Sequence, residues 1–164
     1  MSNFDQQHLS QLGFVGFVPV RSPGRFASQI PSSPGVYAVT LKQPTPEFLA
    51  ISGGGHFKGK PPSVELECLD AKWVDATETL YIGRGGSLRS RIDLLARYGR
   101  GEPVAHQGGR YLWQLAAHDR LCVGWRVDPD PVGSERELLE MFEHELGRLP
   151  FANLVRGTRE LVLA

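Results

Sequence analysis

Short runs in which apolar residues alternate with small or polar ones predict β-strands along the chain. The segment VYAVTL at 36–41 places its second, fourth and sixth residues on one side and the others on the opposite side. The segments LYIG at 80–83 and LCVGWRV at 121–127 have the aromatic and β-branched composition of buried strands. These three segments therefore predict the main strands of one sheet.

Weaker patterns predict the elements around these strands. Residues 3–12 are expected to form a short helix, and FVGFVPV at 14–20 a strand that ends at a proline. PEFLAIS at 46–52 is the predicted hairpin partner of the 36–41 strand. VELECLDAKWV at 64–74 begins like a strand and then loses its alternation, so its structure stays open.

The strand at 80–83 breaks into a glycine turn, GRGG, that leads into an amphipathic helix. Ser87 is a good N-cap for this helix. Leu88, Arg91, Ile92 and Leu95 follow at i, i+3, i+4 and i+7, so they share one helix face. Arg91 is the charged residue on this otherwise apolar face.

The last long helix has the same anomaly with the opposite charge. Asp130 and the proline after it form a good N-cap and first position, and the helix should run to about residue 146 before a glycine. A capping box of Ser134 and Glu137 would start it later. With either start, Glu135 is the acid that falls on the apolar stripe.

A charged side chain on a buried face is costly unless it is paired or binds an ion of opposite charge. Two interpretations of Arg91 and Glu135 follow from this cost. The two residues form a structural ion pair with each other, or they are parts of a site that binds a ligand.

Composition limits the class of protein. The chain has 164 residues, of which 41% are hydrophobic, and this predicts one globular domain, residues 1–164. Eighteen basic and eighteen acidic residues cancel, so an anion site must come from local clustering. Cys68 and Cys122 lack a CxxC spacing, and no apolar run is long enough to span a bilayer. We therefore expect a cytoplasmic protein that does not enter membranes.

The candidate residues also occur in a particular order. Two strands that carry a tyrosine tripeptide precede the arginine helix, and the glutamate helix precedes an asparagine. The residues in question are Gly35, Val36 and Tyr37, then Tyr81, Ile82 and Gly83, then Arg91, Glu135 and Asn153. In this order and spacing, over about residues 34–155, the chain resembles a stand-alone, bacterial-type member of the GIY-YIG nuclease superfamily. The first tripeptide reads GVY, which is a conservative departure.

The resemblance implies an α/β (α+β) fold with a small three-stranded antiparallel sheet flanked by helices. Residues 1–33 would be an N-terminal extension of this core. Residues 42–79, approximately, would be an insertion between the two tyrosine-bearing strands, and the smallest members of the superfamily have no counterpart to it.

The resemblance also implies a metal-dependent nuclease that hydrolyses DNA phosphodiesters. Glu135 would hold one divalent ion, Mg²⁺ or Mn²⁺, and Arg91 would clamp phosphate oxygens. Tyr37 would accept a proton or position water, with Tyr81 as its hydrogen-bonded companion. These roles agree with the chemistry, because Mg²⁺ needs few carboxylates and a guanidinium fork matches a phosphate. Asn153 would either cap a turn or support the metal site.

One position departs from the superfamily pattern. Many members place a histidine one helical turn after the arginine, and here Leu95 occupies that position. His106, in the following loop, is a possible substitute. The glycine- and lysine-rich loop of the insertion is either a DNA contact or an ordinary solvated loop. The candidates for substrate contact are Arg84, Lys58, Lys60, Arg110 and His106.

The sequence leaves several functions open. The leading hypothesis is a DNA nuclease, and the alternative is a catalytically weak or inactive nuclease-like module that binds nucleic acid or protein. The neutral net charge slightly favours this alternative. A third possibility is an enzyme acting on RNA or a nucleotide. The positions of the side chains in the folded protein distinguish these three functions from a purely structural role. A functional site requires both tyrosines, Arg91 and Glu135 to meet at one open surface.

Overall fold

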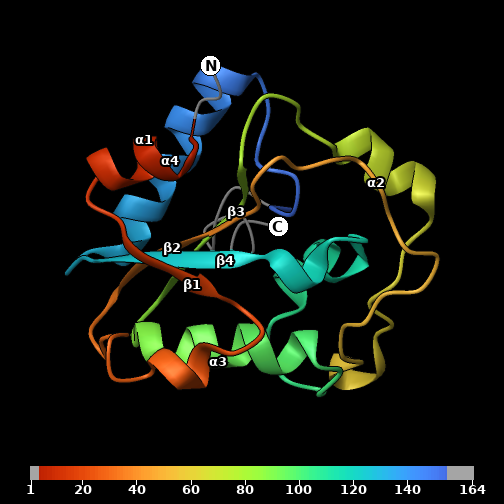
Figure 1. The fold of residues 1–164 in the computed structure, drawn as a ribbon, viewed down its shortest axis with the longest axis horizontal. Helices are drawn as coiled ribbons and strands as arrows, with labels where there is room; N and C mark the ends of the chain where they lie inside the picture. Colours follow the sequence, from red (N-terminus) through yellow and green to blue (C-terminus); the bar gives the residue numbers. More distant parts are fainter. Residues whose placement is uncertain (1–3, 155–164) are drawn as a thin grey trace.

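The structure, a computed structural model, describes residues 4–154 and is built on a four-stranded antiparallel sheet with helices on both faces (Figure 1). The strands pair in the order β1-β4-β2-β3. Their bounds are β1 Val15–Pro19, β2 Gly35–Thr40, β3 Thr79–Gly85 and β4 Cys122–Val127. The three main strands predicted from the alternating pattern are β2, β3 and β4.

Strand β2 forms the centre of the sheet because both of its edges are paired. Tyr37 lies opposite Gly83 of β3 on one side and opposite Trp125 of β4 on the other. Its side chains alternate as predicted: Tyr37 joins the apolar cluster under one face of the sheet, and Val36 and Ala38 join the cluster on the other face.

The expectation of a three-stranded sheet is corrected by β1. Without β1, strand β4 would be an edge strand with a row of unpaired backbone groups. β1 pairs antiparallel with β4 from Val15 opposite Trp125 to Pro19 opposite Cys122, with an irregularity in register after Gly16. The irregularity and the proline both make the new outer edge a poor template for another strand.

The predicted hairpin between 36–41 and 46–52 is wrong, since β3 and β4 already occupy both edges of β2. Residues 46–52 form only an isolated bridge, between Phe48 and Leu115. The buried Gln114 amide holds this part of the insertion, because its nitrogen donates to the carbonyls of Leu49 and Val64 and its oxygen accepts from the Val64 amide. A single side chain therefore replaces the expected strand pairing.

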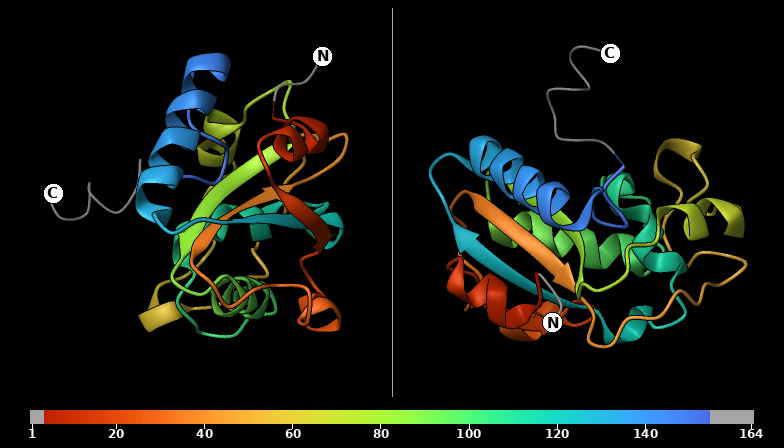
Figure 2. Two further views of the ribbon diagram at one scale, coloured as in Figure 1. Left: turned by 90° about the vertical axis from the view of Figure 1, so that its left-hand side faces the viewer. Right: turned by 90° about the horizontal axis from the view of Figure 1, so that it is seen from above.

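Helices cover both faces of the sheet (Figure 2). Helix α3 (Leu88–Gly99) packs on the face that carries Tyr37, and α1 (Gln6–Gln11) and α4 (Pro131–Leu146) pack on the other. The predicted caps are present, because Ser87 accepts from the Ser90 amide and Asp130 from the Gly133 amide. Within residues 4–154, no helix has the length and apolarity needed to cross a membrane.

The later start of α4, at a Ser134–Glu137 capping box, is wrong. Ser134 lies inside the helix, and its hydroxyl donates to the Asp128 carboxylate in front of it. The helix therefore begins at Pro131, and this start leaves Glu135 in its second turn.

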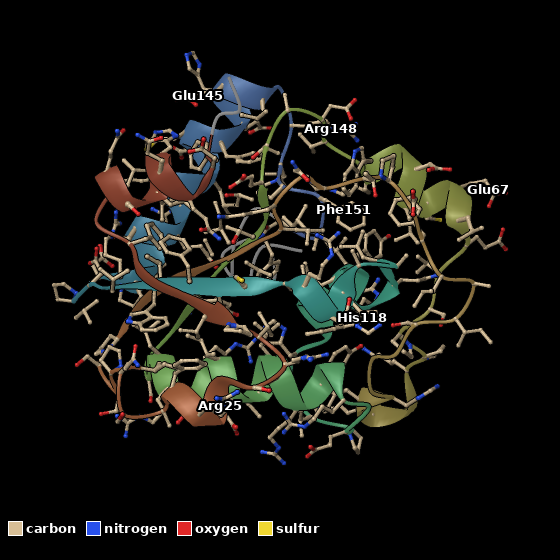
Figure 3. The ribbon with its side chains drawn as sticks, in the orientation of Figure 1. Arg25, Glu67, His118, Glu145, Arg148 and Phe151 are labelled. Carbon is tan, nitrogen blue, oxygen red and sulfur yellow. The ribbon has the colours of Figure 1, made fainter. Side chains whose placement is uncertain are left out.

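The run at 64–74 contains helix α2 (Leu66–Lys72) and no strand. Arg148, just beyond α4, donates to the backbone carbonyls of Ala71 and Trp73 at the end of α2, and Phe151 packs edge-on against the Trp73 ring (Figure 3). The insertion is thus fixed to the segment that follows α4. Short 3-10 segments complete the fold: η1 Pro23–Phe26, η2 Phe57–Gly59, η3 Gln107–Gln114 and η4 His118–Arg120.

The segment after α4 runs back along the outer edge of β3. The Ala152 amide donates to the Leu80 carbonyl. The Asn153 side chain accepts from the Ile82 amide and donates to the Ile82 carbonyl, both at 2.9 Å. The Asn153 amide therefore completes the backbone pairing of β3 up to Ile82, and it holds the strand that carries Tyr81.

Replacing Asn153 by Ala should lower the free energy of unfolding by about 2 kcal/mol, because both backbone groups of Ile82 are buried and lose their partner. Denaturant titration measures this loss. Gln29→Ala, at an exposed position, is the control and should change stability by less than about 0.5 kcal/mol. Equal stability of the Asn153→Ala protein and the wild type would contradict a structural role for this amide.

Candidate functional site

The candidate residues meet around β3, which passes between α3 and α4 (Figure 2). β3 is the last strand of the sheet, so side chains from its two faces approach each other around its edge. Tyr81 belongs to the cluster on the α3 face, and Ile82 belongs to the cluster on the α4 face. Arg84, two residues further along, shares the side of Ile82.

Tyr37 lies at the buried end of the site, so the expectation that both tyrosines reach one open surface is wrong for Tyr37. Its side chain has 0% exposure, and its hydroxyl lies 2.7 Å from Nε2 of His106 in a hydrogen bond. The ring centroids of Tyr37 and Tyr81 are 6.0 Å apart. A Cβ atom at Gly83 would lie 2.5 Å from the Tyr37 ring, so the glycine of the second tripeptide leaves the space that this tyrosine fills.

His106 is fully buried and directly precedes η3. Arg91 donates from Nη1 to the carbonyl of Ala105 at 2.5 Å, which fixes the backbone beside the histidine. The sequence predicted His106 as a possible substitute for the absent helical histidine and as a substrate contact. The structure places it on the Tyr37 hydroxyl, and a side chain without exposed surface is a poor candidate for direct contact with substrate.

Tyr81 retains 8% exposure and is surrounded by the charged members of the site. Burial raises the pKa of its hydroxyl above the ordinary 10.0, and Glu135 raises it further. Three effects lower this pKa: the positive charge of Arg91, a hydrogen bond with Tyr37, and the positive charge of Arg84. The geometry agrees: the Tyr81 ring centroid lies 5.7 Å from that of His106, Arg91 is hydrogen-bonded to the residue before His106, and Arg84, on the same strand as Tyr81, pairs with Glu135.

Glu135 pairs with Arg84 across the edge of β3. Nε of Arg84 lies 3.4 Å from Oε1 of Glu135, and the two side chains are 25% and 12% exposed. From the sequence we expected Glu135 either to pair with Arg91 or to bind a ligand, and we expected Arg84 to contact substrate. The structure instead gives Glu135 an ion pair with Arg84, while Arg91 donates to a backbone carbonyl.

The buried end of the site is electrically neutral. Burial, together with Tyr81, raises the pKa of Tyr37 well above its ordinary 10.0, although Arg91 opposes the shift. Burial, and then Arg91, lowers the pKa of His106 from 6.5 to about 3. Near neutral pH the Tyr37–His106 pair therefore carries no charge, and charge is confined to the more exposed residues.

Lys58 and Lys60, the two candidate lysines of the insertion, do not join this site. Lys58 and Lys60 belong to a loop that packs against the far end of α3, where a Cβ atom at Gly54 would touch the Tyr98 ring. Arg91 lies in the first turn of α3, seven residues before Tyr98, which corresponds to about 10 Å along the helix axis. Both lysines are exposed, as a solvated loop predicts.

Arg110 and Trp113 also lie outside the cluster. The Arg110 guanidinium stands over the Tyr111 ring, 5.5 Å from its centroid, and it lowers the pKa of Tyr98, which burial raises to about 12. Trp113 is buried against Gly99 at the end of α3. These contacts place both residues at the other end of α3 from Arg91.

Glu135 is the carboxylate available for a metal at this place. Among residues 4–154, no group of three or more His, Cys, Asp or Glu residues could hold an ion. Mg²⁺ can be bound by one or two carboxylates together with substrate phosphate and water, so the partly exposed Glu135 fits such an ion. It does not fit a site built from protein ligands alone.

Comparisons of the chain with protein-family models, with curated proteins and with solved structures gave no match. Interpretation of the site therefore rests on the residues and geometry described above.

The buried state of His106 predicts a loss of stability in acid. The unfolded chain binds a proton near pH 6.5, whereas the folded protein does not bind it until about pH 3, so falling pH favours unfolding throughout this window. Between pH 7 and pH 5 His106 alone should cost about 2 kcal/mol. Denaturant titrations of the wild type and of His106→Gln at both pH values measure the difference.

In His106→Gln the acid-induced loss should be smaller by this amount, whereas His144→Gln, at an exposed position on α4, should retain the wild-type dependence. Identical pH dependence in the wild type and His106→Gln would contradict a buried, neutral imidazole.

Proposed function

We propose that this protein is a metal-dependent nuclease that hydrolyses phosphodiester bonds of DNA, as its resemblance to the GIY-YIG nuclease superfamily implies. The observation that carries the proposal is the gathering of Arg84, Arg91 and Glu135 around Tyr81, with Tyr37 and His106 behind it. These side chains come from segments far apart in the sequence. The order of residues along the chain led us to expect most of this set.

Arg91 is the proposed phosphate ligand. One nitrogen of its guanidinium is held by the Ala105 carbonyl, and the helix backbone at Ser87 accepts its amide proton. A guanidinium carries several further N–H donors in a fixed plane, which suits two oxygens of one phosphate. Donors fixed before the reaction stabilise the negative charge that grows on those oxygens.

Glu135 is the proposed metal ligand. A divalent ion held there would polarise the phosphate and make bound water more acidic. Glu135 supplies a hard oxygen donor beside Tyr81, and Arg84 balances its charge from the other side. The protein's own part is to hold this carboxylate next to the phosphate ligand.

The two tyrosines receive different roles. The superfamily resemblance assigns proton acceptance or water positioning to Tyr37, which has 0% exposure here. Tyr81 keeps 8% exposure and faces the charged residues, so we place the attacking water against its hydroxyl. Tyr37 and His106 then hold the Tyr81 hydroxyl in place through the Tyr37 hydrogen bonds.

Two observations favour a second candidate function, a nuclease-like module that binds nucleic acid with little or no cleavage. The chain has a net charge of zero, and Glu135 already has a cationic partner in Arg84. A protein of this kind would bind a duplex in the presence of Mg²⁺ and leave it intact. The cleavage assay below distinguishes the two functions.

Glu135→Gln should reduce cleavage of plasmid and branched DNA in Mg²⁺ or Mn²⁺ by roughly 10²- to 10³-fold, because a neutral amide binds a hard cation poorly. Glu137→Gln removes an exposed carboxylate from the same helix and is the matched control, with activity near that of the wild type. Single-turnover cleavage rates measure both variants.

Equal rates for the wild type and Glu135→Gln would refute the catalytic role of Glu135. Duplex binding without cleavage by the wild type would identify the binding module instead.

A further inference from the structure

The Arg84–Glu135 ion pair occupies the carboxylate that the proposed metal requires. Nε of Arg84 lies 3.4 Å from Oε1 of Glu135, so a cation at that oxygen and the guanidinium would meet at short range. Two positive charges cannot share one carboxylate oxygen without strong repulsion.

We propose that Arg84 and the divalent cation compete for Glu135, and that the displaced Arg84 guanidinium then donates to a phosphate oxygen of the substrate. This inference rests on the proposed nuclease function. It assigns Arg84 two alternative partners, a carboxylate before the ion binds and a phosphate afterwards.

The hydrogen bonding of Arg84 supports an exchangeable position. Its Nε atom is buried, and among the described residues it has no hydrogen-bond partner, although it lies near the Glu135 carboxylate. A buried donor without a partner is costly, so the ion pair holds the guanidinium in an arrangement that leaves one donor unsatisfied. A phosphate oxygen within reach would satisfy it.

The two arginines of the site are held by different kinds of partner. The pairing along the outer edge of β3 that Asn153 provides reaches only to Ile82. The Arg84 guanidinium is held by the Glu135 carboxylate. Arg91, in contrast, is tied to the Ala105 carbonyl. Arg84 is therefore held by a carboxylate that a cation could take over, and Arg91 by a backbone carbonyl.

The exchange couples the metal to the substrate. A dication at Glu135 would stand beside Arg84, whose Nε lies 3.4 Å from the Glu135 carboxylate, and it would add to the positive charge that the two arginines bring to the site. A phosphate dianion or diester neutralises part of this excess charge. Each ligand should therefore increase the affinity for the other, and by thermodynamic linkage the two increases are equal.

Mn²⁺ affinity of the protein without DNA tests the competition directly, with electron paramagnetic resonance as the readout. Arg84→Gln should bind Mn²⁺ about fivefold more tightly than the wild type, the effect expected of a partly exposed ion pair. Arg84→Lys keeps the charge and should stay near the wild type. Arg97→Gln removes an arginine paired with Glu102 at the other end of α3, and it should not change the affinity.

Duplex affinity tests the second half of the exchange. Fluorescence anisotropy of a labelled DNA duplex, in Ca²⁺ and in EDTA, should show that Ca²⁺ strengthens binding by the wild type severalfold more than binding by Arg84→Gln. Thermal unfolding confirms that each variant is folded.

The outcomes separate the two proposals. Equal Mn²⁺ dissociation constants for the wild type and Arg84→Gln, with binding lost in Glu135→Gln, would overturn the exchange and leave the nuclease function standing. Absence of Mn²⁺ binding in every variant would overturn the exchange, and the cleavage rates of the wild type and Glu135→Gln would still decide the nuclease function. An equal effect of Ca²⁺ on duplex binding by the wild type and Arg84→Gln would overturn the transfer of Arg84 to phosphate.

Discussion

The hydrogen bond between Tyr37 and His106 is the contact on which the arrangement of the site depends. It joins the central strand of the sheet to the segment before η3, at a place where neither side chain has exposed surface. A buried hydroxyl or imidazole without a partner would cost stability, so each residue requires the other. The Tyr81 ring packs beside this pair, with centroids 6.0 Å from Tyr37 and 5.7 Å from His106.

The edge position of β3 explains how residues from both faces of the sheet meet. If β3 were a central strand, neighbouring strands at both of its edges would keep side chains on one face, such as Tyr81, apart from side chains on the other face, such as Arg84. Asn153 covers β3 only up to Ile82, and the rest of the strand remains available to Glu135 from α4 and Arg91 from α3. Asn153 therefore stabilises one end of this edge of β3, and the charged side chains of the site lie at the other end.

Local pattern predicted the elements that local chemistry determines. The alternation in β2 and the caps of α3 and α4 were correct. The apolar-face pattern drew attention to Arg91 and Glu135, and the ion pair considered between them is replaced by contacts with the Ala105 carbonyl and with Arg84. Local pattern did not predict contacts between residues far apart in the sequence. Nothing in the sequence near His106 indicates that it meets Tyr37, sixty-nine positions away, or that Glu135 pairs with Arg84. The strand predicted at 14–20 is present as β1, but local pattern did not indicate that it pairs with β4 and makes the sheet four-stranded.

A crystal structure of the protein with Mn²⁺ and a short DNA duplex tests the central claim most directly, because anomalous scattering locates the ion independently of the protein. The account predicts a manganese peak beside the Glu135 carboxylate and a phosphate between the ion and the Arg91 guanidinium, with Tyr37 still on His106. A duplex seated on the loop of Lys58 and Lys60, with no manganese at Glu135, would contradict it.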